Sequence, residues 1–592
     1  MNYFKLNAIC MVMLASGVSP LSSQAATVTA NGSPGGAGAD GVPGNSGLAG
    51  GNGGDTAADA GYVTANSDAV NTATAIGGVG GNGGNGGAGA VSGANGGQGG
   101  NGANGGGALA TAAAIVAGGV NGSVSTSAVG GDGGSGGQGG LPGSGGIAGL
   151  SGNSGGGGDA TAIARISNSG SGLTAATGNA VGGTGGGGFG VNMGNGGAAV
   201  SHSIATASGN SAVTVNDTAT GGNGWTGSDL NNANGGQGGT ANSTASGSNV
   251  GSQSVNISSN AIGGSGGQAY GLGLKAQDGA SASAQASGSS TGGGNVSVTA
   301  TQTGGSGGIG LNQANGGNGA DSVMINAVTG STNGGQLSLT QNAIGGAAGG
   351  TDFVDMNIGA GIAGMAGKGT SNLTVGDGGG GTLKTLSTAS GGGGGFTRFG
   401  TSSDGGAAIN VNNSSSRYDG QAIVAEGRAY GGAGGGFFGF YSSSASSGNG
   451  GSASSSTTGT ASGNSAVTVK DYAYGGNASA VYNDPFNMGG SSGNGGTAIS
   501  SAIGSNAGKQ TVTVSSIAVG GIGAQGGSAR ASADGRSTGG GDVNVSVTQT
   551  AGNTVDSTLN NAATGSTSGN LSLTQNANGG VGGDNALGNS YN

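Results

Sequence analysis

The sequence predicts an all-β repeat protein, built as an elongated β-solenoid of the parallel β-helix type. Three observations predict it. Glycine supplies 158 of 592 residues and charged residues only 6%, whereas ordinary globular domains carry roughly 7% glycine and about 25% charged residues. Short stretches of alternating or β-branched residues recur throughout the chain. A Gly-Gly pair closes each recurrence at a nearly fixed spacing, which is typical of a repeat array.

Each repeat unit contains two predicted strands. The first is an alternating stretch of small residues, such as 199–207, whose period of two indicates one buried face. A turn rich in Ser, Gly and Asn leads to the second, a β-branched stretch such as 296–299. One short strand cannot bury its apolar face alone, so identical units are expected to stack into a continuous core. Stacked β-hairpins are the alternative, because only a short turn separates the two strands.

A glycine tract follows the second strand and has a local period of three. Residues 77–87 read as Gly-Gly-x repeated, with glycine at two of every three positions. A left-handed helix with three residues per turn would place the x residues along one edge and let neighbouring backbones approach on the other two. The tracts are therefore polyglycine II-like helices or flexible loops, since ordering glycine costs much conformational entropy.

The Gly-Gly pairs set the period of the array. They begin at 77, 130, 182, 221, 263, 304, 345, 391, 431, 475 and 520, so the intervals from 182 onward are 39, 42, 41, 41, 46, 40, 44 and 45 residues (for example 221 − 182). The first two intervals, 53 and 52, contain longer glycine tracts. A block of several units is also duplicated: 207–346 corresponds to 461–580, and Leu-Ser-Leu-Thr-Gln-Asn-Ala occurs at 337–343 and 571–577.

The expected organisation has three parts. Residues 1–25 form a secretory signal peptide, with Lys5 before an apolar stretch over 8–15 and Ser23-Gln24-Ala25 as the cleavage site. Residues 26–62 form a glycine-rich N-terminal segment, and 63–592 form the repeat array. The signal predicts a secreted protein or one on the outer cell surface, with no membrane-embedded segment after cleavage. It would also remove Cys10, the only cysteine.

The sequence offers little for catalysis or metal binding. His202 is the only histidine and Glu426 the only glutamate, so neither a triad nor a zinc site has its partners. His202 is expected to be an outward polar residue of a strand. Residues 35–43 and 316–324 match the calcium-binding nonapeptide of β-rolls, but tandem copies are lacking. No cofactor is therefore expected, with calcium as a minor alternative.

Aromatic residues concentrate in one portion of the array, 396–486, which holds 12 of the 20 in the chain. They could contact a sugar or a protein partner, or fill a wider part of the core, and burial is the commoner use of aromatic side chains. The candidate ligand-binding residues are Phe396, Phe399, Tyr418, Tyr430, Phe437, Phe438, Phe440, Tyr441, Tyr472 and Tyr474.

The Gly-Gly-x tracts that alternate with Ala/Ser and Val/Thr strands resemble the repeat regions of large bacterial surface adhesins of the haemagglutinin-like and autotransporter-passenger type. The resemblance covers roughly 26–592 and lies in the style of the repeat. It implies a β-solenoid that acts in adhesion.

The function expected from these observations is non-enzymatic: a secreted or cell-surface structural protein, either an adhesin or a component of an extracellular matrix. Its partners would be a glycan or protein on a host or neighbouring cell, or other copies of itself. The net charge of −10, with no basic cluster, argues against nucleic acid. A self-assembling fibre or biofilm subunit is the alternative, and a β-helix enzyme that degrades polysaccharide is a remote one.

Overall fold

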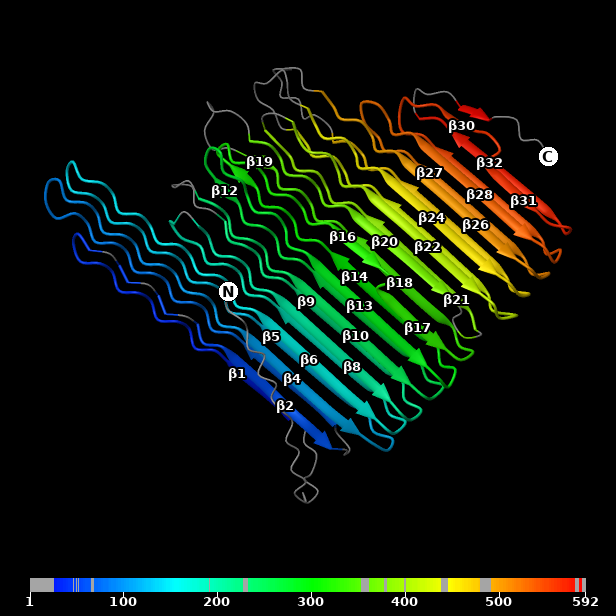
Figure 1. The fold of residues 1–592 in the computed structure, drawn as a ribbon, viewed down its shortest axis with the longest axis horizontal. Coiled ribbons are helices and arrows are strands. Elements are labelled where there is room, and N and C mark those ends of the chain that lie inside the picture. Colours follow the sequence, from blue (N-terminus) through cyan, green and yellow to red (C-terminus); the bar gives the residue numbers. More distant parts are fainter. Residues whose placement is uncertain are drawn as a thin grey trace.

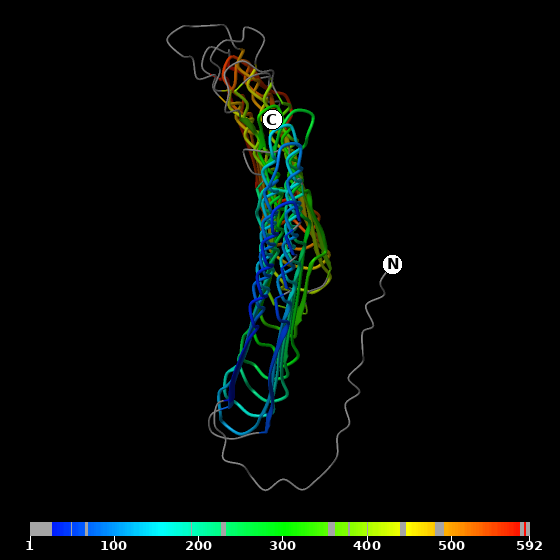
Figure 2. The same cartoon turned by 90° about the vertical axis from the view of Figure 1, so that its left-hand side faces the viewer.

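The structure, a computed structural model, describes residues 26–587 except 46, 49, 52, 65–68, 191, 227–232, 353–360, 377–378, 380, 399–400, 438–445, 480–490 and 581–584. The proposed signal peptide lies outside the described residues. The described chain is all-β and forms a parallel β-solenoid, drawn in Figure 1 as a stack of strands side by side. Figure 2 shows the same stack edge-on as a narrow slab.

One continuous sheet of 14 strands, here the valine sheet, runs the whole length of the stack. Its strands, in spatial order, are β1 (Ala26–Asn31), β3 (Ala69–Ile76), β5 (Gly122–Val129), β7 (Thr174–Val181), β9 (Val213–Thr220), β11 (Val255–Ile262), β14 (Val296–Thr303), β18 (Leu337–Ile344), β21 (Leu383–Ser390), β23 (Ile423–Tyr430), β25 (Val467–Tyr474), β27 (Val512–Val519), β29 (Val543–Thr550) and β32 (Leu571–Asn578).

Two sheets of seven strands, the first and second alanine–serine sheets, face the valine sheet. The first contains β2 (Thr56–Thr64), β4 (Ala108–Val116), β6 (Ala160–Asn168), β8 (Ala199–Ala207), β10 (Ala241–Asn249), β13 (Ala282–Ser290) and β17 (Val328–Thr332). The second contains β16 (Ser322–Ile325), β20 (Gly369–Gly376), β22 (Ala408–Ser416), β24 (Ala453–Ala461), β26 (Ala498–Asn506), β28 (Ala529–Ser537) and β31 (Ala563–Ser566). Small sheets join β12 (Ala269–Tyr270), β15 (Gly310–Leu311) and β19 (Thr351–Asp352), and β30 (Ser557–Leu559) with β33 (Asn585–Leu587).

The strands pair in parallel with the matching strand of the next coil. Val255 lies between Val213 and Val296 in the valine sheet, so like residues stack on like. The register offset of 42 residues between the first two (255 − 213) equals the spacing of the Gly-Gly pairs at 221 and 263. The stacked-hairpin alternative is wrong, because the two strands of one unit, such as β8 and β9, belong to different sheets.

The core is narrow because large residues face small ones. Valine, isoleucine and leucine of the valine sheet point inward against alanine, serine and glycine of the facing sheets. Gly504 illustrates the fit, since a Cβ there would lie 2.6 Å from a γ carbon of Val514. Segment 26–62 belongs to the same stack: it provides β1 and most of β2, which pair with β3 and β4.

The glycine tracts form an ordered extension, here the glycine wing, that projects from the strands at the upper left of Figure 1. The triplet 133–135 shows how its backbone groups are satisfied. The N–H of Gly133 donates to Thr184 O of the next coil, and that of Gly134 to Ala103 O on the facing leg. The third N–H, from Ser135, donates to the side-chain oxygen of Asn82. The tracts are therefore packed polyglycine II-like helices rather than loops.

The Asn and Asp residues at x positions repeat this last contact along the wing. Asp404 accepts the N–H of Asn449 at 2.8 Å, and Asn449 in turn accepts that of Asn494 at 2.8 Å. Each side chain thus replaces the backbone partner that the outer edge of a glycine helix lacks. This explains why the x residue is so often Asn or Asp in a chain with few charged residues.

One coil in each copy of the duplicated block interrupts the alanine–serine layer. Asn326 adopts φ +48°, after which the chain changes partner: β16 pairs with β20, while β17 pairs with β13. Gln341 fills the break, because its Oε1 accepts the N–H of Ala327 at 2.7 Å and its Nε2 donates to Met324 O at 3.2 Å. Gln575 makes the same bond to Ala562 in the duplicated block. The repeated Leu-Ser-Leu-Thr-Gln-Asn-Ala motif thus marks a strand break.

Candidate functional site

Among its described strands, the outer face of the valine sheet carries charged and aromatic residues in one place only. Its outward positions are mostly Ser, Thr and Asn, but β21, β23 and β25 carry every charged and aromatic residue that its described strands present outward. We call this place, with two apolar residues of β27, the tyrosine patch. It comprises Lys384, Leu386, Glu426, Arg428, Tyr430, Lys470, Tyr472, Tyr474, Ile517 and Val519.

The in-register parallel pairing brings the three tyrosines together. Tyr430 lies beside Tyr474, with ring centroids 5.2 Å apart and an interplanar angle of 4°. Tyr472 is parallel to Tyr474 within 6° at 6.5 Å, two residues away on the same strand. Because neighbouring side chains on one sheet face interact directly, such stacking stabilises the sheet. It also turns ring faces toward each other and leaves edges and hydroxyl groups outward.

Arg428 is held on two sides. Its Nε donates to Glu426 Oε1 at 2.7 Å, and a terminal nitrogen lies 2.5 Å from the same oxygen. Its guanidinium carbon lies 5.9 Å from the centroid of Tyr472, within the range of cation–π attraction. Burial opposes the charge of Arg428, but the bond and charge of Glu426 outweigh burial and raise the pKa of the guanidinium.

The hydroxyls of Tyr472 and Tyr474 remain protonated donors at neutral pH. Partial burial raises the pKa of Tyr472, and the carboxylate of Glu426 adds to this shift. Burial, followed by the neighbouring Tyr430, raises the pKa of Tyr474. With three cations against one carboxylate (3 − 1), the tyrosine patch carries +2 on a chain of net charge −10.

The structure separates the predicted aromatic candidates. It unites Tyr430, Tyr472 and Tyr474, whereas Phe437 is only 3% exposed and fills the interior. Tyr418 is exposed in the turn between β22 and β23, and Phe396 lies in the glycine wing near Gly350. Phe399, Phe438, Phe440 and Tyr441 lie outside the described residues.

Sequence reasoning missed the charged members of the tyrosine patch. Glu426, Arg428 and Tyr430 alternate along β23, as Lys470, Tyr472 and Tyr474 do along β25. The common spacing of each set from its Gly-Gly pair, at 431 and 475, places the two sets side by side. This common spacing could have been used to predict from the sequence that the two sets lie together.

Two aspartates are buried between the sheets, and the duplication makes them equivalent. Asp471 Oδ1 accepts the hydroxyls of Ser455 at 2.6 Å and Thr457 at 2.5 Å, and Oδ2 accepts Ser500 Oγ at 2.7 Å and Ser501 N at 3.0 Å. Asp217 has the matching set of three serine hydroxyls and one backbone N–H.

Each carboxylate joins two successive coils without a cation. Burial outweighs the four hydrogen bonds and raises the pKa of Asp471 to about 6, and burial also raises the pKa of Asp217. In the structure, all four groups around each aspartate donate to its carboxylate. Each aspartate thus stabilises the core by linking neighbouring coils through hydrogen bonds.

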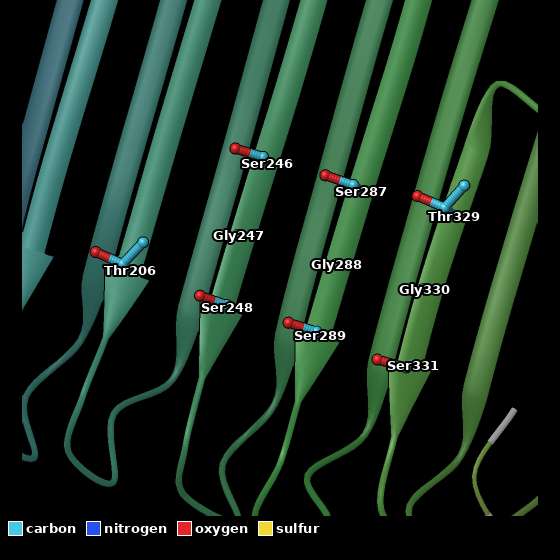
Figure 3. Close-up of a pocket in the computed structure, with 10 residues that line it drawn as sticks. All are labelled: Thr206, Ser246, Gly247, Ser248, Ser287, Gly288, Ser289, Thr329, Gly330 and Ser331. Carbon is cyan, nitrogen blue, oxygen red and sulfur yellow. The ribbon is translucent and has the colours of Figure 1, made fainter.

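A shallow hollow of about 390 Å³ lies on the outer face of the first alanine–serine sheet (Figure 3). Two rows of hydroxyls flank a row of glycines: Ser246, Ser287 and Thr329 on one side, and Thr206, Ser248, Ser289 and Ser331 on the other. The glycines let the sheet dip, since a Cβ on Gly247 would lie 2.2 Å from Ile257 Cδ1. The lining is small and uncharged, and we assign no ligand to it.

The remaining sequence candidates take structural positions. His202 occupies an outward position on β8, and partial burial, followed by the nearby Arg165, lowers its pKa. Asp40 and Asp321, from the two calcium-like nonapeptides, accept the backbone N–H groups of Asn85 and Lys368. Among the described residues, no group of three or more His, Cys, Asp or Glu is placed to hold a metal ion. That part of the chain also contains no helix with the length and apolarity of a membrane span.

Comparison with known proteins gave no match to any protein-family model, curated protein or solved structure.

Proposed function

We propose that this protein is a non-enzymatic structural protein, secreted or displayed on a cell surface, that acts in adhesion or in an extracellular matrix. The observation that carries the proposal is the continuity of pairing: the valine sheet runs in register through 14 strands, and the glycine wing is hydrogen-bonded coil to coil beside it. Such an array makes a stiff plate that presents one surface over a long distance.

The tyrosine patch favours a protein that binds a partner in addition to serving as a structural scaffold. It is a local departure from an uncharged surface of mostly Ser, Thr and Asn, and aromatic and arginine side chains are enriched where proteins meet partners. The resemblance to repeat regions of bacterial surface adhesins favours the same function.

The test is to locate the protein and remove it in the cells that produce it. Antibody labelling of intact cells should detect it outside, and deletion of its gene should lower retention of cells on a surface several-fold. Complementation with the intact gene serves as the control. Labelling only after permeabilisation, or unchanged retention after deletion, would contradict the proposal.

A self-assembling fibre subunit is a second candidate, favoured by the exposure of β32. Leu571 and Leu573 are 45% and 41% exposed there, whereas their duplicates Leu337 and Leu339 are at most 1% exposed. A second copy stacked on this edge would cover both leucines. Sedimentation velocity over a hundredfold concentration range would distinguish the candidates: growing species that Leu571→Ser/Leu573→Ser suppresses support assembly, and a concentration-independent monomer opposes it.

A further inference from the structure

We infer that the tyrosine patch binds an anionic polysaccharide of the polyuronate class, laid across the strands of the valine sheet. The inference rests on the proposed role in adhesion and names the ligand chemistry of that role. It starts from the confinement of outward charge and aromatic rings to adjacent strands of a sheet whose other outward residues are mostly Ser, Thr and Asn, with scattered valine and isoleucine.

The stacking of the rings determines how the patch can meet a sugar. Tyr430 and Tyr474 cover each other, and Arg428 lies over Tyr472, so these ring faces are already occupied. A flat sugar ring therefore cannot stack on them as it would on an isolated tyrosine. The phenolic hydroxyls can donate and accept hydrogen bonds instead.

The patch is rich in donors and positively charged. Three phenol groups, the guanidinium of Arg428 and the ammonium groups of Lys384 and Lys470 all donate, and Glu426 is the only anion among them. A ligand that fits must supply acceptors and negative charge. This sign is opposite to that of the chain as a whole, which carries −10, so attraction would be focused on the patch.

Glu426 shows which anion the patch accepts. Its carboxylate lies against Arg428 with two nitrogens within 2.7 Å of one oxygen, while Lys470 is its neighbour in register on β25. A carboxylate therefore already sits in this environment, and arginine is well suited to that planar group. Uronate residues carry the same group at every sugar, which favours them over neutral glycans.

The dimensions suit a polymer. The patch covers four adjacent strands, β21, β23, β25 and β27. The charged and phenolic donors lie on the first three of these strands, so two gaps of about 4.8 Å each span about 10 Å along the stack, which accommodates a pair of linked sugars. The donors repeat from strand to strand, so a chain with a regularly repeated carboxylate meets several of them at once.

The test measures binding of the full-length secreted chain to immobilised polygalacturonate, with EDTA present to exclude calcium bridges. Uncharged dextran and dextran sulfate are the comparison polymers. Lys384→Gln/Lys470→Gln removes two charges from the patch, and Lys368→Gln/Lys509→Gln removes the same charge elsewhere. A triple Tyr→Phe variant at 430, 472 and 474 keeps the stacked rings and removes only their hydroxyls.

We expect binding to polygalacturonate that weakens with salt, about tenfold weaker for the patch lysine variant and about fivefold weaker for the triple phenylalanine variant. The control lysine variant should stay within about twofold. Circular dichroism of each variant should match the original chain, so that loss of binding is not loss of fold.

Three results would overturn the inference. These are no binding to polygalacturonate, equal loss in both lysine variants, or binding as strong to dextran or stronger to dextran sulfate. None of them affects the tests of surface location and cell retention, so a scaffold with another partner would remain distinguishable from a chain that is not an adhesin at all.

Discussion

Replacing Asp471 by Asn should stabilise the solenoid at neutral pH and leave it nearly unchanged in acid. The carboxyl has a pKa of about 6 in the fold against 3.8 for the free side chain. A group whose pKa is raised on folding contributes its stability below pH 3.8 and loses it as the pH rises through 6. At about 1.36 kcal/mol per pKa unit, the difference (6 − 3.8) corresponds to about 3 kcal/mol.

Asparagine reproduces the protonated form of Asp471. Its oxygen can accept from Ser500 and Ser501, while its NH₂ group faces the hydroxyls of Ser455 and Thr457, which can rotate to accept. No hydrogen-bond donor of the asparagine side chain then faces another donor. The free energy of unfolding of Asp471→Asn should therefore be close to that of the original chain near pH 3 and exceed it by about 3 kcal/mol at pH 7.5.

The assay is urea unfolding followed by circular dichroism at both pH values. Because repeat arrays can unfold in parts, hydrogen exchange of peptides from β24 to β27 accompanies it. Asp404→Asn, which removes a carboxylate charge but keeps an oxygen that can accept the Asn449 N–H, is the control for a simple change in net charge. An identical pH dependence in Asp471→Asn and the original chain, or a less stable variant at pH 7.5, would refute the reasoning.

Other predictions concern the wing and the strand break. Gly134→Ala would place a Cβ 2.1 Å from the backbone oxygen of Gly81, so the hydrogen-exchange rate of amides in the wing should rise by at least tenfold. Gly36 has open space where a Cβ would lie, so the exchange rate in Gly36→Ala should stay within about twofold of the original. Gln341→Ala leaves the partly buried N–H of Ala327 and the buried carbonyl of Met324 without this partner, so the free energy of unfolding in urea should fall by about 2 kcal/mol. Unchanged stability would contradict the proposal that Gln341 fills the strand break. Asn449→Ala should cost about 1 kcal/mol, seen as faster exchange of the Asn494 amide that it caps; equal exchange would show that water replaces the cap.

Much of the fold could be predicted because two features of the repeat specify it, one the buried face of each strand and the other the register between strands. Alternation marks the buried face of each strand, and the Gly-Gly spacing gives the register, as the offsets of 53 from β3 to β5 and 39 from β7 to β9 show. The order of the glycine tracts could not be predicted, because it depends on partners in other coils. A lone tract carries the entropy of a flexible loop, and only stacking supplies the acceptors.

The site was harder to predict because it arises between coils. The aromatic enrichment over 396–486 was visible, but it mixed an interior residue, Phe437, with three outward tyrosines. Separating them requires the phase of each residue relative to its Gly-Gly pair. The burial of Asp471 could not be predicted for the same reason. Its neighbours in sequence are a lysine and a tyrosine, whereas its hydrogen-bond partners come from two other strands.

The glycine wing also determines where the sequence of such a molecule can gain or lose residues. The strands keep nearly constant lengths, while successive offsets in the valine sheet range from 53 residues between β3 and β5 to 28 between β29 and β32. Most of that variation therefore falls in the wing, where one Gly-Gly-x triplet from each leg can be gained or lost without altering the register of either sheet. The outline of the plate can thus be lengthened or trimmed coil by coil, while the surface that carries the tyrosine patch stays the same.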